Sequence, residues 1–293
     1  MSANPFVLDD DRAYRQWRDL KLRAYPYNIE SLFCDIAAEQ ISGTEKAALQ
    51  NIIQQYNFVF YRTQQTGAAD KTFVRELGKA LGLSRLDGNL CSDDDNITAL
   101  QVMNMGRANT YIPYTDKPLS WHTDGYYNSS EKQIKAISMH CVRPATEGGM
   151  NLFMDHEMAY IQLRDENPAL IKALMHPQAM TIPPNIENGQ EIRAAQSGPV
   201  FSLLPQHNKL HMRYSARTRN IEWRDDSATQ EAVDCLKSML VENNPYVIAY
   251  RLAAGEGIIC NNILHNRSRF TNTAGQSGRL LYRARYYDRI ANS

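Results

Sequence analysis

The feature that most constrains the fold is a series of short β-prone runs that begins near Asn96 and continues towards the end of the chain. Runs such as residues 134–142 and 247–252 are separated by Gly, Pro, Asn and Asp. Short strands joined by turn-forming residues are typical of antiparallel barrels and sandwiches. The sequence therefore predicts a mainly β chain with flanking helices.

Several segments have the apolar spacing of helices. The pattern predicts helices over residues 44–56, 71–81, 154–175 and 229–242. A short apolar run at 58–61 predicts a strand between the first two helices, and Gly82 stands where the second helix would end. The polar stretch 183–198, which is punctuated by Gly and Pro, is interpreted as a loop or lid.

The organisation of the chain favours a single domain. Its 293 residues contain no clean linker, so we expect one domain over 1–293. In this interpretation an α/β N-terminal part (1–95) packs on a β core (96–293), and a helical and loop insertion lies at about 154–200.

Composition narrows the class of protein. Lys and Arg number 32, as do Asp and Glu, and a balanced charge argues against binding nucleic acid or membranes through a general positive field. Five widely spaced cysteines argue against a disulfide framework. The sequence shows neither the apolar core of a signal peptide nor a run long enough to span a bilayer. A cytoplasmic protein is the expectation; its oligomeric state, a homo-oligomer included, is left open.

A candidate metal pair lies in the segment 120–125. Residues two apart in an extended segment point to the same face, so His122 and Asp124 can offer an imidazole nitrogen and a carboxylate oxygen to one cation. With seven histidines and 32 acidic residues, about one such pair is expected by chance. Because Thr-Asp-Gly also suits a surface turn, the pair by itself favours a turn over a metal site.

A third candidate ligand, His265, ends a β-prone run that follows a turn framed by Gly255 and Gly257. Two close ligands and a distant histidine are what a facial triad of two histidines and one carboxylate requires, and such a triad leaves open positions on iron(II). The same donors also suit zinc or manganese. The residues alone therefore do not select the metal.

Three arginines lie in the last β-prone run. Alternation over residues 279–287 places Arg279, Arg283 and Arg285 on one face. For any one arginine, a solvated face of an edge strand is the simpler interpretation. Three on one face also suit an anion site, because arginine binds carboxylates bidentately.

In their order and spacing, these motifs resemble the taurine dioxygenase/clavaminate synthase-like family of Fe(II)/2-oxoglutarate-dependent oxygenases, with local similarity to glutarate hydroxylases. The resemblance covers about residues 96–290, with a fainter echo at 56–62 and 72–82. It depends on His122-Thr123-Asp124, Gly148-Gly149 followed by Asn151, Gly255-Glu256-Gly257, Asn261-Asn262, Leu264-His265, and Arg279 fourteen residues after His265.

The resemblance implies a double-stranded β-helix, or jelly roll, as the core. It implies that His122, Asp124 and His265 bind Fe(2+), that Arg279 holds the distal carboxylate of 2-oxoglutarate, and that Asn151 lies near the same carboxylate. Dioxygen would be the other co-substrate, with succinate and carbon dioxide as products. A carboxylate at Asp124 implies oxidation without halide transfer, and no catalytic residue beyond the metal ligands is implied.

The prime substrate is predicted to be a small anion. The resemblance implies a substrate contact from Arg283, although a slip of two residues would transfer it to Arg285; Tyr126 and Arg213 are further candidates. The metal, its carboxylate ligand, 2-oxoglutarate and the arginine that holds it sum to zero charge. Arg283 in the cavity would then be uncompensated, which is costly for a buried charge. A carboxylate, amino acid or sulfonate substrate would supply the missing charge.

Two other functions stay open at this point. One is a zinc- or manganese-dependent hydrolase or isomerase in a similar barrel, and the other is a non-catalytic 2-oxoglutarate-binding protein. Arg279 after His265 favours the oxygenase over the hydrolase, and the intact set of three ligands disfavours the non-catalytic protein. The sequence does not identify the prime substrate or decide between hydroxylation and desaturation.

Overall fold

A computed structural model describes residues 4–26, 28–37, 41–63, 71–88, 93–103, 111–204 and 209–293. The chain divides into two compact units, and each combines segments that are distant in sequence. The first unit comprises Met1–Tyr25, Trp121–Gln133 and Met154–Val247, and the second comprises Pro26–Ser120, Ile134–Phe153 and Ile248–Ser293. That these two units together form one domain over 1–293 stays a prediction.

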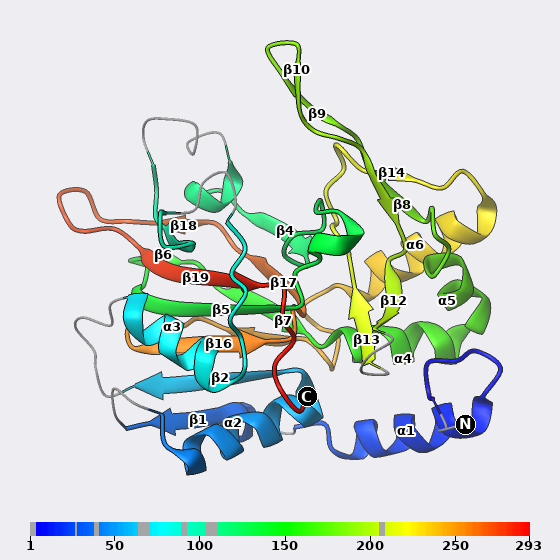
Figure 1. The fold of residues 1–293 in the computed structure, drawn as a ribbon, viewed down its shortest axis with the longest axis horizontal. Helices are drawn as coiled ribbons and strands as arrows, with labels where there is room; N and C mark the ends of the chain where they lie inside the picture. The colour runs from blue at the N-terminus through cyan, green and yellow to red at the C-terminus, as the bar shows by residue number, and fades with distance from the viewer. Residues whose placement is uncertain are drawn as a thin grey trace. The chain divides into compact units, whose positions relative to one another are not determined.

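The second unit is built on a six-stranded sheet (Figure 1). Its order is β1 (Phe33–Ile36), β2 (Phe58–Thr63), β16 (Glu256–Cys260), β5 (Ala136–Arg143), β19 (Leu280–Tyr286) and β3 (Ile97–Leu100). The first two strands are parallel, and the other neighbours are antiparallel. The predicted N-terminal α/β part thus adds strands to the same sheet as the C-terminal strand.

Two helices cover one face of this sheet, α2 (Gly43–Tyr56) and α3 (Lys71–Ala80), close to the predicted bounds. Helix α2 begins at Ser42, whose side chain forms a capping box with Glu45 and so satisfies backbone N–H groups of the first turn. Helix α3 ends before Gly82, whose φ of 82° is the left-handed conformation expected at a helix C-terminus.

The opposite face of the six-stranded sheet packs against a four-stranded sheet. Its order is β15 (Ile248–Tyr250), β7 (Asn151–Met154), β17 (Leu264–Arg267) and β4 (Leu119–His122). Alternation along β2 sends Phe58 and Phe60 into this interior and Val59 and Tyr61 towards the helices. Each fully buried phenylalanine contributes roughly 1.5–3 kcal/mol of transfer free energy. The short strands β6 (Glu147–Gly148) and β18 (Phe270–Thr271) also pair.

Four helices lie in the first unit: α1 (Asp11–Arg23), α4 (His156–Glu166), α5 (Pro168–Leu174) and α6 (Ser227–Met239). The helical prediction over 154–175 is confirmed for α4 and α5, but a single unbroken helix is wrong, because the chain breaks at Asn167. The residue before a proline is disfavoured in helical conformation, and Asn167 is extended with φ −162° before Pro168 starts α5. Two small sheets accompany the helices: β11 (Gln196–Gly198), β8 (Met180–Ile182) and β14 (Glu222–Trp223), and β12 (Phe201–Leu204) with β13 (Lys209–Met212).

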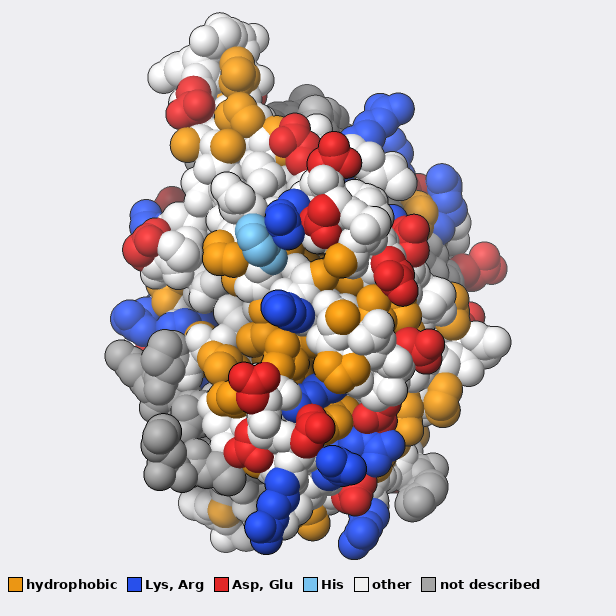
Figure 2. Space-filling model, turned by 90° about the vertical axis from the view of Figure 1, so that its right-hand side faces the viewer, with side chains coloured by type: hydrophobic (Ala, Val, Ile, Leu, Met, Phe, Trp, Pro, Cys, Tyr) orange, Lys and Arg blue, Asp and Glu red, His pale blue; other side chains and the backbone are white. Residues whose placement is uncertain are grey.

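The loop predicted over 183–198 is also wrong. It contains a hairpin of β9 (Asn185–Glu187) and β10 (Gln190–Arg193), followed by β11. Asn188 and Gly189 both have positive φ, 51° and 77°, which is the two-residue turn that matches strand twist. Ile186 and Ile192 are exposed on this hairpin, and Figure 2 shows hydrophobic side chains along it at the top of the view.

The predicted class, mainly β with flanking helices, is confirmed, and the described residues contain six α-helices. The two main sheets of the second unit are open sheets. The closed jelly roll that the family resemblance implies stays a prediction. Within the described ranges, no helix is both long and apolar enough to cross a bilayer.

The buried His140 in β5 predicts a pH dependence of stability. Burial lowers the pKa of its imidazole to about 4, and its Nδ1 lies 3.1 Å from the Tyr61 hydroxyl. The unfolded chain, with a histidine pKa near 6.5, binds the proton first as the pH falls, so protonation opposes folding between these values. At pH 5 the loss is about 2 kcal/mol relative to neutral pH.

Denaturant unfolding at pH 7.5 and pH 5 checks this loss. His140→Gln keeps a partner for the Tyr61 hydroxyl but does not titrate, so its stability should fall by about 2 kcal/mol less than that of the wild type. Equal losses in the two proteins would show that His140 does not contribute.

Candidate functional site

The segment that holds the predicted metal pair is fixed by pairing with a second segment of its unit. The Thr123 N–H donates to the Tyr214 carbonyl at 3.0 Å, and the Tyr214 N–H donates to the Thr123 hydroxyl at 3.0 Å. His122 also forms an isolated bridge with Ser215. These contacts anchor the segment to residues 214 and 215, with His122 at the end of β4 (Leu119–His122) and Asp124 at the start of a turn.

The His122 and Asp124 side chains lie close together and are buried. The distance from His122 Nε2 to Asp124 Oδ1 is 3.4 Å, and the two residues are 6% and 5% exposed. Adjacent ligands at about 2.1 Å from one cation lie about 3 Å apart, so this separation suits two ligands of one metal.

His265 lies in β17, and its ring is oriented by its own strand. Its Nδ1 is 3.0 Å from the Ile263 carbonyl oxygen. A carbonyl can only accept a hydrogen bond, so Nδ1 carries the proton and Nε2 carries the lone pair. Metal-binding histidines are commonly oriented in this way, with the second ring nitrogen donating to a carbonyl or carboxylate.

The three predicted ligands form one candidate metal-binding group. One ligand atom from each of His122, Asp124 and His265 lies within 4.8 Å of the other two, and all three residues are buried. The strands that end at His122 and contain His265, β4 and β17, are neighbours in the four-stranded sheet. Two imidazoles and a carboxylate suit iron(II), zinc or manganese, so the donor set fits the metal that the sequence predicted.

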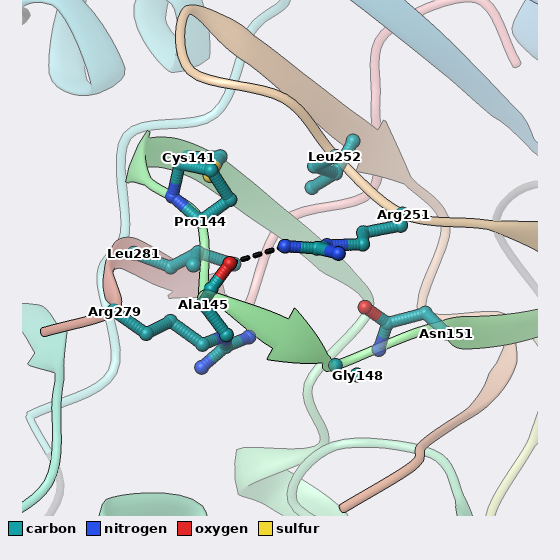
Figure 3. A pocket seen from close by; sticks show the side chains of 10 residues that line it. Cys141, Pro144, Ala145, Gly148, Asn151, Arg251, Leu252, Arg279 and Leu281 are labelled. Atoms are coloured by element: carbon teal, nitrogen blue, oxygen red, sulfur yellow. Dashed lines mark hydrogen bonds between the residues drawn. The ribbon is translucent and has the colours of Figure 1, made fainter. Parts of the chain in front are cut away.

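A pocket in the second unit contains both residues predicted to bind 2-oxoglutarate, Arg279 and Asn151 (Figure 3). Gly148 and Gly149 form one wall, with φ of 69° and 73°. A Cβ on Gly148 would come within 2.2 Å of the Arg269 carbonyl, so this wall requires glycine. The glycine pair of the sequence motif therefore shapes the pocket.

Arg279 is a buried cation without an anionic partner among the described residues. It is 6% exposed, its guanidinium lies 5.1 Å from the centroid of the Phe270 ring, and its backbone N–H donates to the Asn272 side-chain oxygen at 3.0 Å. Burial lowers its pKa to about 10. An uncompensated buried guanidinium is costly, and an acidic ligand in the pocket would remove that cost.

Arg251, which lines the same pocket, differs from Arg279 because the backbone satisfies it. It donates to the carbonyls of Ala145 and Thr146, and Figure 3 shows the first of these bonds. One of the Asn151 amide N–H groups donates to the Asn266 carbonyl at 2.5 Å.

The other two arginines of the last strand have different surroundings. Arg285 forms a buried ion pair with Asp87, which also accepts a hydrogen bond from the Tyr287 hydroxyl at 2.5 Å. Arg283 is 7% exposed and lies on the same face of β19 as Leu281, which lines the pocket. The ion pair occupies Arg285, and a substrate contact from either arginine stays a prediction.

Arg213 is tied to backbone carbonyls. Its guanidinium donates to the carbonyls of Tyr126 at 2.7 Å, Gln196 at 2.7 Å, Met180 at 2.9 Å and Gly198 at 3.5 Å. These acceptors account for four of its five N–H groups, and direct contact between Arg213 and substrate stays a prediction.

Residues around His265 have structural roles that sequence reasoning did not assign. Asn262, with φ of 52°, turns the chain between β16 and β17 and donates to the Ile134 carbonyl at 2.6 Å. Buried Arg267 donates to the carbonyls of Thr115 and Lys117 at 2.8 and 2.5 Å. Consecutive asparagines after a strand were a signal for the turn, but nothing in the sequence marks the distant acceptors of Arg267.

Comparison with known proteins identifies relatives over much of the chain. A curated uridine-5'-phosphate dioxygenase from Amycolatopsis sp is 30% identical over 177 residues, or 57% of this chain. The match spans 60% of that relative, less than two thirds of its length.

Solved structures match at low identity and therefore show the fold alone. An asparagine oxygenase in complex with Fe(II), 2S,3S-3-hydroxyasparagine and succinate has a TM-score of 0.56 and 14% identity, covering 84% of each chain. The non-heme iron oxygenase OrfP has a TM-score of 0.61 and 12% identity, covering 86% of this chain and 82% of that chain.

A model of the family described as "Taurine catabolism dioxygenase TauD, TfdA family" matches residues 29–285. This range includes all three candidate metal ligands, the pocket with Arg279, and both main sheets. The family resemblance predicted from the motifs is confirmed: the chain belongs to the TauD, TfdA family of dioxygenases.

Proposed function

We propose that the protein is an iron(II)- and 2-oxoglutarate-dependent dioxygenase that oxidises a small anionic substrate and releases succinate and carbon dioxide. The observation that carries this proposal is the cluster of two imidazoles and one carboxylate, whose ligand atoms lie within 4.8 Å of one another. Family membership supports the reaction class, and the solved relatives that contain iron and succinate support the choice of metal and co-substrate.

In this proposal His122, Asp124 and His265 hold one face of the iron. The hydrogen bond from His265 Nδ1 to the Ile263 carbonyl fixes the ring and directs Nε2 to the metal. Bound iron(II), with 2-oxoglutarate and dioxygen, supplies the oxidising chemistry. The hydrogen bonds between Thr123 and Tyr214 hold the segment that carries the other two ligands.

The pocket side chains position the co-substrate. Arg279 receives the distal carboxylate of 2-oxoglutarate, which supplies the negative charge that its surroundings lack. Asn151 lines the same pocket, and its second amide N–H can donate to that carboxylate. An enzyme that binds only a metal does not require an unpaired arginine here, so this observation favours the oxygenase over a zinc or manganese hydrolase.

The substrate is proposed to be a small carboxylate, amino acid or sulfonate, with Arg283 and Tyr126 in its binding site. The curated relative acts on uridine-5'-phosphate according to its name, which adds a nucleotide as a second candidate. Both kinds of substrate are anions. We also propose a double-stranded β-helix for the paired sheets, a single domain and a cytoplasmic location.

Anaerobic addition of iron(II) and 2-oxoglutarate tests the proposed function. We expect a weak visible charge-transfer band, because 2-oxoglutarate chelates iron held by the three ligands. In air, the same protein should convert 2-oxoglutarate to succinate, faster when a screen of small acids, amino acids and nucleotides reaches the prime substrate. Tight zinc binding without the band would instead support a hydrolase, and a band without succinate would support a non-catalytic protein.

A further inference from the structure

Three arginines gather around Tyr126, which follows Asp124 by two residues in the first unit. Arg213 donates from Nε to the Tyr126 carbonyl, and Arg217 donates from Nη1 to the Tyr126 hydroxyl at 3.3 Å. Arg193, at the end of the β9–β10 hairpin, lies near the Tyr126 and Tyr127 side chains. Arg193 is also close enough to Arg213 to lower its pKa.

None of the three arginines forms an ion pair with an acidic residue in the part of the chain that the structure describes. Arg193 donates to the carbonyls of Ala194 at 3.1 Å and Pro183 at 2.9 Å, and Arg213 donates only to carbonyls. Carbonyl oxygens satisfy N–H groups but carry no net charge. Burial, with no nearby carboxylate to oppose it, lowers the pKa of both Arg193 and Arg213.

The three side chains differ in what they can offer a ligand. Arg213 is 6% exposed and uses four of its N–H groups, so it contributes charge and holds the Tyr126 backbone. Half-buried Arg193 has N–H groups beyond the two bonds to carbonyls, and Arg217 is exposed. The Tyr126 hydroxyl accepts from Arg217 and can donate its own proton.

We propose that Arg193, Arg217 and the Tyr126 hydroxyl form a subsite for a doubly charged oxyanion of the prime substrate, such as a phosphate group. This inference rests on the proposed function, because it assigns the subsite to the substrate of that oxidation. A dianion matches the two charges of buried Arg213 and half-buried Arg193 better than a single carboxylate does, and tetrahedral oxygens accept several N–H and O–H donors at once. The subsite follows a metal ligand in sequence, and its residues all lie in the first unit.

Inorganic phosphate is the probe that tests this subsite. Phosphate is titrated calorimetrically, under anaerobic conditions, into protein that contains iron(II) and saturating 2-oxoglutarate, so that Arg279 is already occupied. Arg193→Gln and Arg217→Gln should each weaken phosphate binding about 10- to 100-fold, the effect of losing one charged hydrogen bond. Arg193→Lys, which keeps the charge, should weaken it less than Arg193→Gln.

Arg219→Gln is the matched control, because Arg219 is exposed in the same segment, whereas it is Arg217 that donates to the Tyr126 hydroxyl. It should bind phosphate as the wild type does. Wild-type protein that binds no phosphate, or equal weakening in all three glutamine variants, would overturn the subsite. The charge-transfer band is recorded in each sample before the titration. If wild-type protein shows no band, the result counts against the oxygenase function. If the band is present but the Arg193 and Arg217 variants keep the wild-type affinity for phosphate, the result counts against the subsite alone.

Discussion

Asp124→Gly is expected to abolish substrate oxidation. Asp124 supplies the only carboxylate of the three clustered ligands, and it is 5% exposed with Oδ1 3.4 Å from His122 Nε2. Loss of outer-shell partners of a metal typically costs 10–100-fold, so loss of a direct ligand should cost at least about 100-fold in the rate of product formation. The rate is measured as succinate formed with the stimulating substrate.

Two further variants serve as controls for the loss of activity in Asp124→Gly. Asp225→Gly removes an exposed acidic residue of the same unit and should keep the wild-type rate. Asp124→Glu retains a carboxylate but displaces it by one methylene, so we expect a rate between those of wild type and Asp124→Gly. Wild-type product formation by Asp124→Gly would show that this carboxylate is not a ligand.

Arg279→Leu is expected to weaken 2-oxoglutarate binding while stabilising the protein without ligand. A bidentate pair with the distal carboxylate contributes about 3 kcal/mol or more, so affinity should fall at least about 100-fold. Removing an uncompensated buried cation, which has no acidic partner among the described residues, should raise the thermal midpoint of the ligand-free protein. Both effects are measured by thermal unfolding with and without 2-oxoglutarate.

Arg251→Leu, a substitution in the same pocket, is expected to change the stability of the ligand-free protein in the opposite direction. It leaves the carbonyls of Ala145 and Thr146 without their donor, so the ligand-free protein should become less stable. A lower thermal midpoint for Arg279→Leu, with 2-oxoglutarate still stabilising the variant as it does the wild type, would contradict the assigned role of Arg279.

Local patterns were sufficient to predict the elements whose cause is local. Apolar spacing located α2 and α3 to within two residues, and Gly82 ends α3 as predicted. The two errors also have local causes that the sequence displayed: Pro168 breaks the long helix, and Asn188-Gly189 forms a hairpin turn. The helical spacing of the surrounding residues outweighs Pro168 in the first prediction, and the polar composition of residues 183–198 outweighs Asn188-Gly189 in the second.

The site could be predicted only as far as short spacing and family resemblance extend. The i, i+2 spacing of His122 and Asp124 places the two side chains close together at the end of a strand, and hydrogen bonds between Thr123 and Tyr214 hold this segment. The Arg285–Asp87 ion pair joins residues almost 200 positions apart, and no pattern in either segment identifies the other. Such tertiary contacts decide which arginines already have an acidic partner, and therefore which ones can bind an anionic ligand.

We expect one iron(II) to be bound by His122, Asp124 and His265 while Arg279 holds 2-oxoglutarate. A crystal structure of protein loaded anaerobically with iron(II) and 2-oxoglutarate, with data collected at the iron absorption edge, tests it most directly. We predict one anomalous peak in contact with the two imidazoles and the carboxylate, and the distal carboxylate of 2-oxoglutarate on the Arg279 guanidinium. An iron peak elsewhere in the protein, or one beyond coordinating distance of His265, would contradict the account.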